Sequence, residues 1–391
     1  MNADGDAELD QVLCLTATGN PRLLSALRNW RREMPDALLQ AALTPQPINE
    51  MVAALKIEPN RISHTQLLAH LHFNLSGHLR DHSLEPVLRA ARLRNGLRNK
   101  KLLLERNEIM ARLQAHGLNM LVFKGADLAY SVYPDPCCRV VGDIDLLIEE
   151  MKYERATKTL LAEGFIPLDR SSLQTRKGIT KITSWTHPEF TISLDIQIHA
   201  NHHATWSGAD QLYFTHAVTR GDAANGEILA LCPEHALVQV CGHGLAQNFY
   251  PPVRWAADAV WILRSAGGEF NWDLALEAVH NNHSAPILSV AMNYLRIVLG
   301  TEIPQEAISQ LNPTLSRRTF QTAWSYRLDQ PNGQRERIAG FVARFRETCP
   351  DEKIWHATGR LPNYLRDSQN TSSVISAIGK LARKVIMNKY G

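Results

Sequence analysis

A ten-residue segment with strict alternation of apolar and polar side chains places the strongest constraint on the fold of this chain. The apolar set is Phe190, Ile192, Leu194, Ile196 and Ile198, and the polar set between them is Thr191, Ser193, Asp195, Gln197 and His199. Successive side chains of a β-strand point to opposite faces of a sheet, so this period of two predicts a strand with one face in the core. The polar face is expected to be exposed or to line a site.

Apolar spacing divides the rest of the chain into a helical start, a mixed middle and a helical remainder. Spacing of three and four residues runs through residues 7–120 and returns from Pro233 onward. Gly117 stands where a helix C-cap is expected, just before the first extended run. The middle is expected to contain strand Leu121–Phe123, a short helix from Gly125 to Pro134, strand Arg139–Ile148, helix 151–163 and strand Ile179–Thr186.

These patterns predict an α+β fold in which a small mixed β-sheet is flanked by N-terminal helices and by a helical C-terminal half. The length of 391 residues is enough for two or three domains at about 150 residues each. We expect an N-terminal helical region at 1–100, an α/β core at 101–205, a helical domain at 206–305 and a C-terminal helical region at 306–391.

Bulk composition excludes several classes of protein. Hydrophobic residues make up 45% and charged residues 21% of the chain, as in globular domains and unlike disordered or collagen-like chains. A net charge of +3 gives no strong signal for nucleic-acid binding. The chain has no apolar run of about 18 residues, so no transmembrane segment is predicted. The acidic start lacks the basic region of a secretory signal, and six cysteines without C-x-x-C spacing indicate a reduced, cytoplasmic protein.

The segment Asp143-Ile144-Asp145 places two carboxylates on one face of a predicted strand, about 6.6 Å apart along it. Carboxylates this close repel each other unless a cation lies between them, and hard oxygen ligands favour Mg²⁺ or Mn²⁺. Asp195, on the polar face of another strand, is a candidate third ligand. Three carboxylates on adjacent strands fit the two-metal arrangement of phosphoryl or nucleotidyl transfer. A D-x-D pair also occurs on surfaces, in calcium sites and in glycosyltransferases; the lack of a long parallel βαβ succession argues against a glycosyltransferase.

A second motif, Lys124-Gly125-Ala126, lies between a predicted strand and a predicted helix. This position directs backbone N–H groups and a helix N-terminus toward a potential anion. Gly125 would let a phosphate approach the backbone, and Lys124 would add a point charge. Asp127 in the same turn partly cancels this positive potential. The alternative is a tight turn at Gly125 beside a solvated lysine.

Histidines near the carboxylate strands are further candidates. His199 closes the alternating strand, and we expect it to contact Asp195 or a substrate. A zinc site that combines it with His202-His203 is the less favoured interpretation. His235 and His243 lie eight residues apart on one predicted helix, where they are either structural or line a nucleotide cleft.

Three basic features have two interpretations each. Arg254 either reaches a phosphate or pairs with Asp258 four residues later. The run of arginines and lysines within Val87–Gly117 is either a solvated face or a stripe that attracts a polyphosphate or an acidic partner. The amphipathic segment Ser373–Tyr390 either covers the protein's own core or makes peripheral contact with a membrane or partner.

The order of these motifs resembles the signature of the uncharacterised nucleotidyltransferase family, within the DNA polymerase β-like nucleotidyltransferase superfamily. That signature runs hydrophobic-K-G-A, a helix ending in Y-P, an Arg, D-I-D-L-L, a helix ending near G-F or G-Y, L-D-x-x-x-H, spaced histidines and R-W-x-x-D. The matching positions are Lys124-Gly125-Ala126, Tyr133-Pro134, Arg139, Asp143, Asp145, Gly164-Phe165, Leu194-Asp195, His199, His235, His243, Arg254-Trp255 and Asp258. The resemblance covers roughly residues 95–305.

The resemblance implies an enzyme that uses Mg²⁺ or Mn²⁺ to move a nucleoside monophosphate from an NTP, with ATP favoured, to an unidentified hydroxyl or phosphate acceptor. Asp143, Asp145 and Asp195 would be its catalytic and metal-binding residues. The implied nucleotide ligands are Lys124, Gly125, Ala126 and Arg139, and the implied cleft residues are His199, His243 and Arg254. The wider superfamily usually has Gly-Ser where this chain has Gly125-Ala126, so a catalytically silent member that binds or regulates a protein partner is the alternative function.

Overall fold

The computed structural model describes residues 67–76, 85–168, 182–201, 210–221, 226–247, 254–281, 284–311 and residue 362. The helices expected before residue 67, the His202-His203 pair, and nearly all of region 306–391 with its amphipathic segment at 373–390 lie outside these residues. In the described part of the chain, no helix is both long and apolar enough to cross a bilayer.

A seven-stranded sheet forms the centre of the described structure, in the order β3-β4-β5-β2-β1-β7-β6. Strands β2 and β5 pair in parallel, as do β1 and β7, and all other neighbours are antiparallel. The sheet is therefore mixed, which confirms the predicted α+β class. The strands are β1 (Leu121–Phe123), β2 (Ile144–Leu147), β3 (Ile166–Pro167), β4 (Ile182–Thr186), β5 (Leu194–Gln197), β6 (Val218–Arg220) and β7 (Ile228–Ala230).

Two of the predicted strands are shorter than their sequence patterns because side chains of helix α7 (Glu85–Ala115) take their backbone hydrogen bonds. The backbone N–H groups of Thr191 and Ile192 donate to the Glu105 carboxylate at 3.0 and 3.1 Å, so β5 begins only at Leu194. In the same way, Asn99 donates to the Arg139 carbonyl at 2.7 Å. The 3₁₀ turn η2 (Pro136–Cys138) lies directly before Arg139, and β2 begins only at Ile144.

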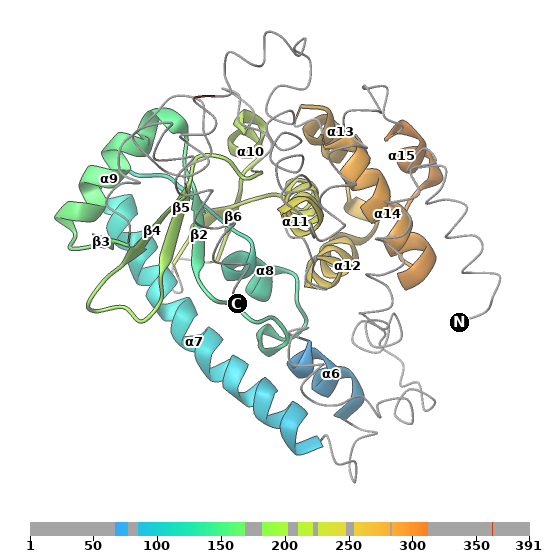
Figure 1. The fold of residues 1–391 in the computed structure, drawn as a ribbon, viewed down its shortest axis with the longest axis horizontal. Coiled ribbons are helices and arrows are strands. Elements are labelled where there is room, and N and C mark those ends of the chain that lie inside the picture. The colour runs from blue at the N-terminus through green and yellow to red at the C-terminus, as the bar shows by residue number, and fades with distance from the viewer. Residues whose placement is uncertain are drawn as a thin grey trace.

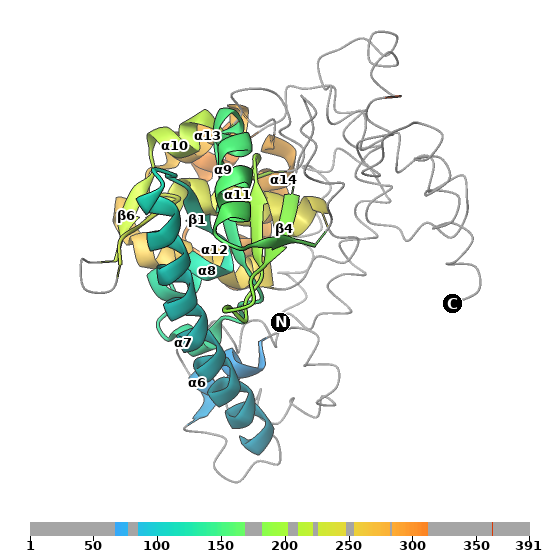
Figure 2. The same cartoon turned by 90° about the vertical axis from the view of Figure 1, so that its left-hand side faces the viewer.

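Helices surround the sheet on both sides (Figures 1 and 2). Figure 1 shows α7 and α9 beside the sheet at the left and α11 to α15 gathered at the right, with α6 against the far end of α7. Helix α7 continues through Gly96. A Cβ at this position would lie 2.7 Å from the Cys137 sulfur, so the close approach of η2 requires glycine. The helices are α6 (Leu68–Leu75), α8 (Gly125–Ser131), α9 (Tyr153–Ala162), α10 (Gln211–Thr215), α11 (Pro233–Gln247), α12 (Arg254–Ala266), α13 (Trp272–Asn281), α14 (Ala285–Leu299) and α15 (Gln305–Gln310), with 3₁₀ turns η3 (Glu150–Lys152) and η5 (Gly267–Glu269).

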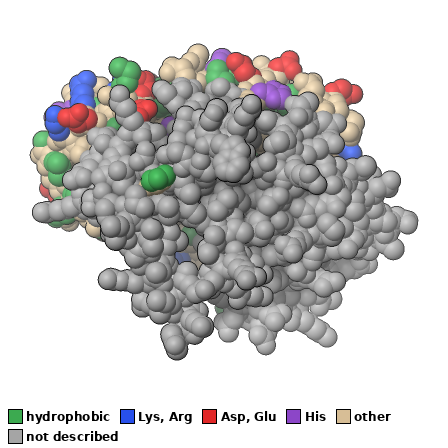
Figure 3. All heavy atoms as spheres, turned by 45° about the horizontal axis from the view of Figure 1, so that its top comes forward, with side chains coloured by type: hydrophobic (Ala, Val, Ile, Leu, Met, Phe, Trp, Pro, Cys, Tyr) green, Lys and Arg blue, Asp and Glu red, His purple; other side chains and the backbone are tan. Residues whose placement is uncertain are grey.

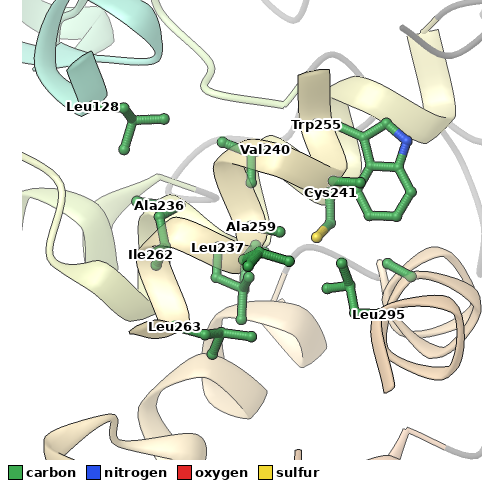
Figure 4. Packing of buried hydrophobic residues seen from close by; sticks show 14 of the residues in the cluster. Leu128, Ala236, Leu237, Val240, Cys241, Trp255, Ala259, Ile262, Leu263 and Leu295 are labelled. Carbon is green, nitrogen blue, oxygen red and sulfur yellow. The ribbon is translucent and has the colours of Figure 1, made fainter. Parts of the chain in front are cut away.

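Buried apolar side chains form two clusters. One lies between the sheet, α7 and α9 and includes Ile109, Leu146 and Leu160. The other joins β1 and α8 to helices α11 to α14, and Figure 4 shows part of it, with Leu237 and Cys241 of α11 among its members. The strand that leads into the Lys124 motif is thus packed against the helical half. On the face in Figure 3, acidic and basic side chains of described residues lie interspersed rather than in a patch of one sign.

Candidate active site

The three predicted carboxylates come together where β1 ends and where β2 and β5 begin. Asp145 of β2 lies directly beside Asp195 of the parallel strand β5, and Phe123, the last residue of β1, pairs with Asp145 from the other side. Asp143 precedes β2 by one residue. Asp145 is buried, whereas Asp143 and Asp195 are partly exposed. The pairing of β2 with β5 thus brings Asp195 next to Asp145, and a shared site with Asp143 stays a prediction.

Two side chains donate to the same oxygen of Asp145. The Lys124 ammonium lies 2.7 Å from Oδ1, and Nε2 of Gln197 donates to that oxygen at 2.6 Å. Gln197 stands two residues after Asp195 and therefore faces the same side of the sheet. Its side chain was not among the predicted site residues, although the alternating pattern had placed it on the polar face.

Burial is the main influence on the pKa values of Asp145 and Asp195. Burial, followed by repulsion from Asp143 and Asp195, raises the pKa of Asp145 to about 6, and Lys124 opposes this shift. Burial also raises the pKa of Asp195, against a hydrogen bond from Ser184. A lysine alone thus does not neutralise this group of acids.

The donor set fits a divalent metal ion in chemical type. Carboxylate oxygens are the ligands that Mg²⁺ and Mn²⁺ prefer. Oε1 of Gln197 is a further oxygen donor, buried and without a hydrogen-bond partner in the described structure. The described residues contain no group of three His, Cys, Asp or Glu side chains already arranged to hold a metal ion.

Lys124 and Gly125 form the turn between β1 and α8 that the sequence predicted. Lys124 has φ of 56° and ψ of −137°, and in the described structure it is the one non-glycine residue with positive φ. Gly125 is buried against Arg139, and a Cβ at Gly125 would lie 3.1 Å from the guanidinium Nη1. The small size of Gly125 therefore has a structural cause besides the predicted phosphate contact. Ala126 is fully buried, and its carbonyl accepts a hydrogen bond from Arg106 at 2.7 Å.

Asp127, in the first turn of α8, forms an ion pair with an arginine. Its carboxylate lies 3.1 Å from Nε of Arg220, and the Arg106 charge also acts on it. Burial nevertheless raises the pKa of Asp127 to about 6. Its effect on the anion site predicted at Gly125 is therefore reduced by a local ion pair.

Arg139, predicted as a nucleotide ligand, is held by α12. Its Nε and Nη2 donate to the two oxygens of Asp258 at 2.7 and 2.9 Å, and its Nη1 donates to the Val140 carbonyl. Asp258 also accepts from the Tyr133 hydroxyl at 2.7 Å. The structure thus places Arg139 in a buried polar network behind the carboxylates.

Arg254 lies near both this network and the carboxylates. The pKa of Arg254 falls to about 10, chiefly through the charge of Arg139 and through burial, while Asp258 and Asp143 oppose the shift. Arg254 is thus within electrostatic range of both Arg139 and Asp143, and its role as a cleft residue stays a prediction.

The histidines have structural environments. Nδ1 of His199 lies 2.7 Å from Asp210, so the expectation that it contacts Asp195 is wrong. The reason is that Asp210, at the start of α10, binds His199 and also accepts the Ala200 N–H shortly after β5. His235 is buried against the Tyr213 ring at 4.8 Å, and burial lowers its pKa to about 4. His243 is half-buried on α11.

Comparisons with known proteins agree with the motifs. Residues 60–300, more than half of the chain, match the family described as uncharacterised nucleotidyltransferase. The comparison with curated proteins gave no match. Among solved structures, an antigenic nucleotidyltransferase-like protein from Paracoccidioides brasiliensis is similar at 17% identity and a TM-score of 0.37, over 54% of this chain and 96% of that chain. On the family match, this chain belongs to the uncharacterised nucleotidyltransferase family.

Proposed function

We propose that this protein transfers a nucleoside monophosphate from an NTP, with ATP favoured, to a hydroxyl or phosphate acceptor in a reaction that depends on Mg²⁺ or Mn²⁺. The observation that carries the proposal is the group of carboxylates where β2 and β5 run side by side: Asp145 lies next to Asp195, Asp143 precedes them, and burial raises the pKa of both Asp145 and Asp195. Asp143 and Asp145 would hold the metal, which supplies charge neutralisation to the phosphates when it is bound.

The other residues have roles that follow from their positions. Lys124 and the backbone at Gly125 lie beside the carboxylates and bind the triphosphate. Asp195 is partly exposed and has a raised pKa, so it suits a proton acceptor for the incoming hydroxyl. In the transfer, the acceptor oxygen bonds to the α-phosphorus, the bond from that phosphorus to the bridging oxygen breaks, pyrophosphate leaves, and the acceptor proton passes to Asp195.

A non-catalytic role is the second candidate, and two observations favour it. Ala126 lacks the hydroxyl that the wider superfamily usually offers at this position, and the guanidinium of Arg139 is already bound to Asp258. Such a protein would use the same fold to bind a protein partner without transferring a nucleotide.

The experiment that separates the two functions incubates the protein with Mg²⁺ or Mn²⁺, each α-³²P-labelled NTP in turn, and cell extract. Label on a small molecule, an RNA or a protein identifies the acceptor class. Asp143→Asn and Asp145→Asn are expected to abolish the label and the rise in melting temperature that metal plus NTP produces. Absence of label with the native protein, together with equal stabilisation of native protein and variants, would contradict nucleotidyl transfer and favour the second candidate.

A further inference from the structure

The ammonium of Lys124 forms an ion pair with Asp145, the most buried of the three carboxylates. It lies 2.7 Å from Oδ1 of Asp145 and 4.9 Å from the centre of the Phe123 ring, and only 13% of the Lys124 side chain is exposed. We infer that Lys124 is a resident counter-ion of Asp145, which leaves Asp145 for the triphosphate when a divalent cation and an NTP bind together. This inference rests on the proposed function and concerns how its site is regulated.

Two positive charges compete for Asp145. Lys124 and Gln197 both bond Oδ1, so an ammonium already lies where a divalent cation would approach this carboxylate. Two like charges this close repel each other strongly at a partly buried site. Binding of a cation to Asp145 with Lys124 in place is therefore opposed, although the partly exposed Asp143 and Asp195 would attract it.

Gln197 keeps Asp145 in position once Lys124 has left. Its side chain is 1% exposed, and it projects from β5, which pairs with β2 over four residues. A donor held on a central strand fixes the carboxylate, whereas the four-carbon stem of a lysine can turn to another anion. The Oε1 atom of Gln197, which has no partner in the described structure, remains available as an acceptor beside Asp145.

The backbone at Lys124 holds the ammonium at Asp145 in the resting state. Lys124 has φ of 56° and ψ of −137°, a conformation that residues with a side chain rarely adopt. This conformation turns the chain directly from β1 into α8, and Lys124 directly follows Phe123, the residue that pairs with Asp145 in the adjacent strand. Lys124 gains a new anion only when a triphosphate arrives, so metal and NTP are expected to bind with positive cooperativity.

The test measures Mn²⁺ binding to the full-length protein by electron paramagnetic resonance, without nucleotide and with a non-hydrolysable ATP analogue. Lys124→Met is expected to bind Mn²⁺ at least tenfold more tightly than the native protein when no nucleotide is present, and to lose most of the gain that the analogue gives the native protein. Lys124→Arg retains a competing cation and is expected to bind Mn²⁺ as the native protein does.

Lys152→Met is the matched control because Lys152 also pairs with a carboxylate, Glu149, at 2.9 Å, on the surface at η3. It is expected to leave Mn²⁺ affinity unchanged. Equal or weaker Mn²⁺ binding by Lys124→Met, in a protein whose native form binds Mn²⁺ and the analogue through Asp145, would overturn the inference and leave the proposed function standing. No binding of metal or analogue by any of the proteins would overturn both.

Discussion

Arg139 and Asp258 form a buried, doubly hydrogen-bonded ion pair that ties the segment before β2 to helix α12. The two N···O distances are 2.7 and 2.9 Å, and the side chains are 6% and 5% exposed. The Tyr133 hydroxyl adds a third donor to Asp258, and burial together with the carboxylate raises the pKa of Tyr133. The loop that leads into Asp143 is therefore positioned by the helical half of the protein.

The first prediction concerns this pair. Asp258→Ala is expected to lower the free energy of unfolding by about 3–5 kcal/mol, because it leaves a buried guanidinium without a counter-charge. Urea denaturation measures the change. The double variant Arg139→Met with Asp258→Leu removes both charges. It is expected to lose clearly less free energy of unfolding than Asp258→Ala does. A loss below about 1 kcal/mol in the single variant would show that the pair contributes no more than an exposed one.

The second prediction compares two glycines near the carboxylates. A Cβ at Gly125 would lie 3.1 Å from Nη1 of Arg139, which Asp258 and Val140 hold in place, so Gly125→Ala is expected to cost about 1–3 kcal/mol of stability. No atom lies within 4 Å of the corresponding position at Gly142, so Gly142→Ala is the control and is expected to cost little. Equal stabilities of the two variants in urea would contradict the close packing at Gly125.

The same contact affects the predicted phosphate role of Gly125. The phosphate contact predicted for Gly125 implies that Gly125→Val weakens NTP binding, but in the structure the added side chain would first collide with Arg139. NTP affinity is therefore to be measured per folded molecule, by titration at a temperature where both variant and native protein remain folded. A loss of affinity beyond the loss of folded protein supports a backbone contact to phosphate.

The third prediction isolates the backbone conformation of Lys124. Lys124→Ala and Lys124→Gly both remove the ammonium from Asp145, but only glycine adopts φ of 56° and ψ of −137° without steric cost. Lys124→Gly is expected to be more stable than Lys124→Ala by about 1 kcal/mol. Comparison of the two unfolding free energies in metal-free buffer is the measurement, and a more stable alanine variant would contradict the strain.

The fourth prediction is that Asp195 acts on the chemical step. Asp195 is partly exposed and lies beside the buried Asp145, so its loss is expected to spare the site that holds the nucleotide. Asp195→Asn is expected to keep NTP affinity within a few fold and to reduce kcat by about 10²-fold or more, the scale of general acid–base assistance. Once an acceptor is identified, turnover close to that of the native protein would remove Asp195 from the catalytic group.

The sequence predicted those parts of the fold and site that depend on local periodicity. Alternation correctly placed Asp195 on a polar face, the D-x-D spacing placed Asp143 and Asp145 together, and the turn after Phe123 began a helix at Gly125. These features depend on residues close in sequence, for which side-chain direction follows from the backbone period alone.

The contacts that local periodicity does not predict involve partners elsewhere in the sequence. Glu105 lies 86 residues before Thr191, yet its carboxylate takes the backbone N–H that the longer β5 would have used. The side chain of Asp210 forms a hydrogen bond with His199, beyond the end of β5. Arg139 donates to Asp258, which lies 119 residues later in the chain. No periodic signal marks such pairs, because each depends on how the helices pack against the sheet.

The last prediction concerns pH and His70 of α6. Nε2 of His70 accepts a hydrogen bond from Trp261 Nε1 at 3.0 Å, and burial lowers the pKa of His70 to about 3. The unfolded chain, with a histidine pKa near 6.5, thus binds more protons between pH 3 and 6.5 than the folded protein does. The contribution of neutral His70 to the free energy of unfolding is fully present above pH 6.5 and is lost as the pH falls toward 3.

His70→Gln keeps an acceptor for Trp261 but removes this titration. Between pH 6 and 4.5 the free energy of unfolding of the native protein is expected to fall more steeply than that of the variant, by about 1.4 kcal/mol per pH unit. Asp127, whose raised pKa of about 6 gives the opposite slope, is present in both proteins and cancels in the difference. Urea denaturation at four pH values gives the two slopes. Parallel slopes would mean that His70 is protonated in the folded protein, and the hydrogen bond from Trp261 would then be absent in acid.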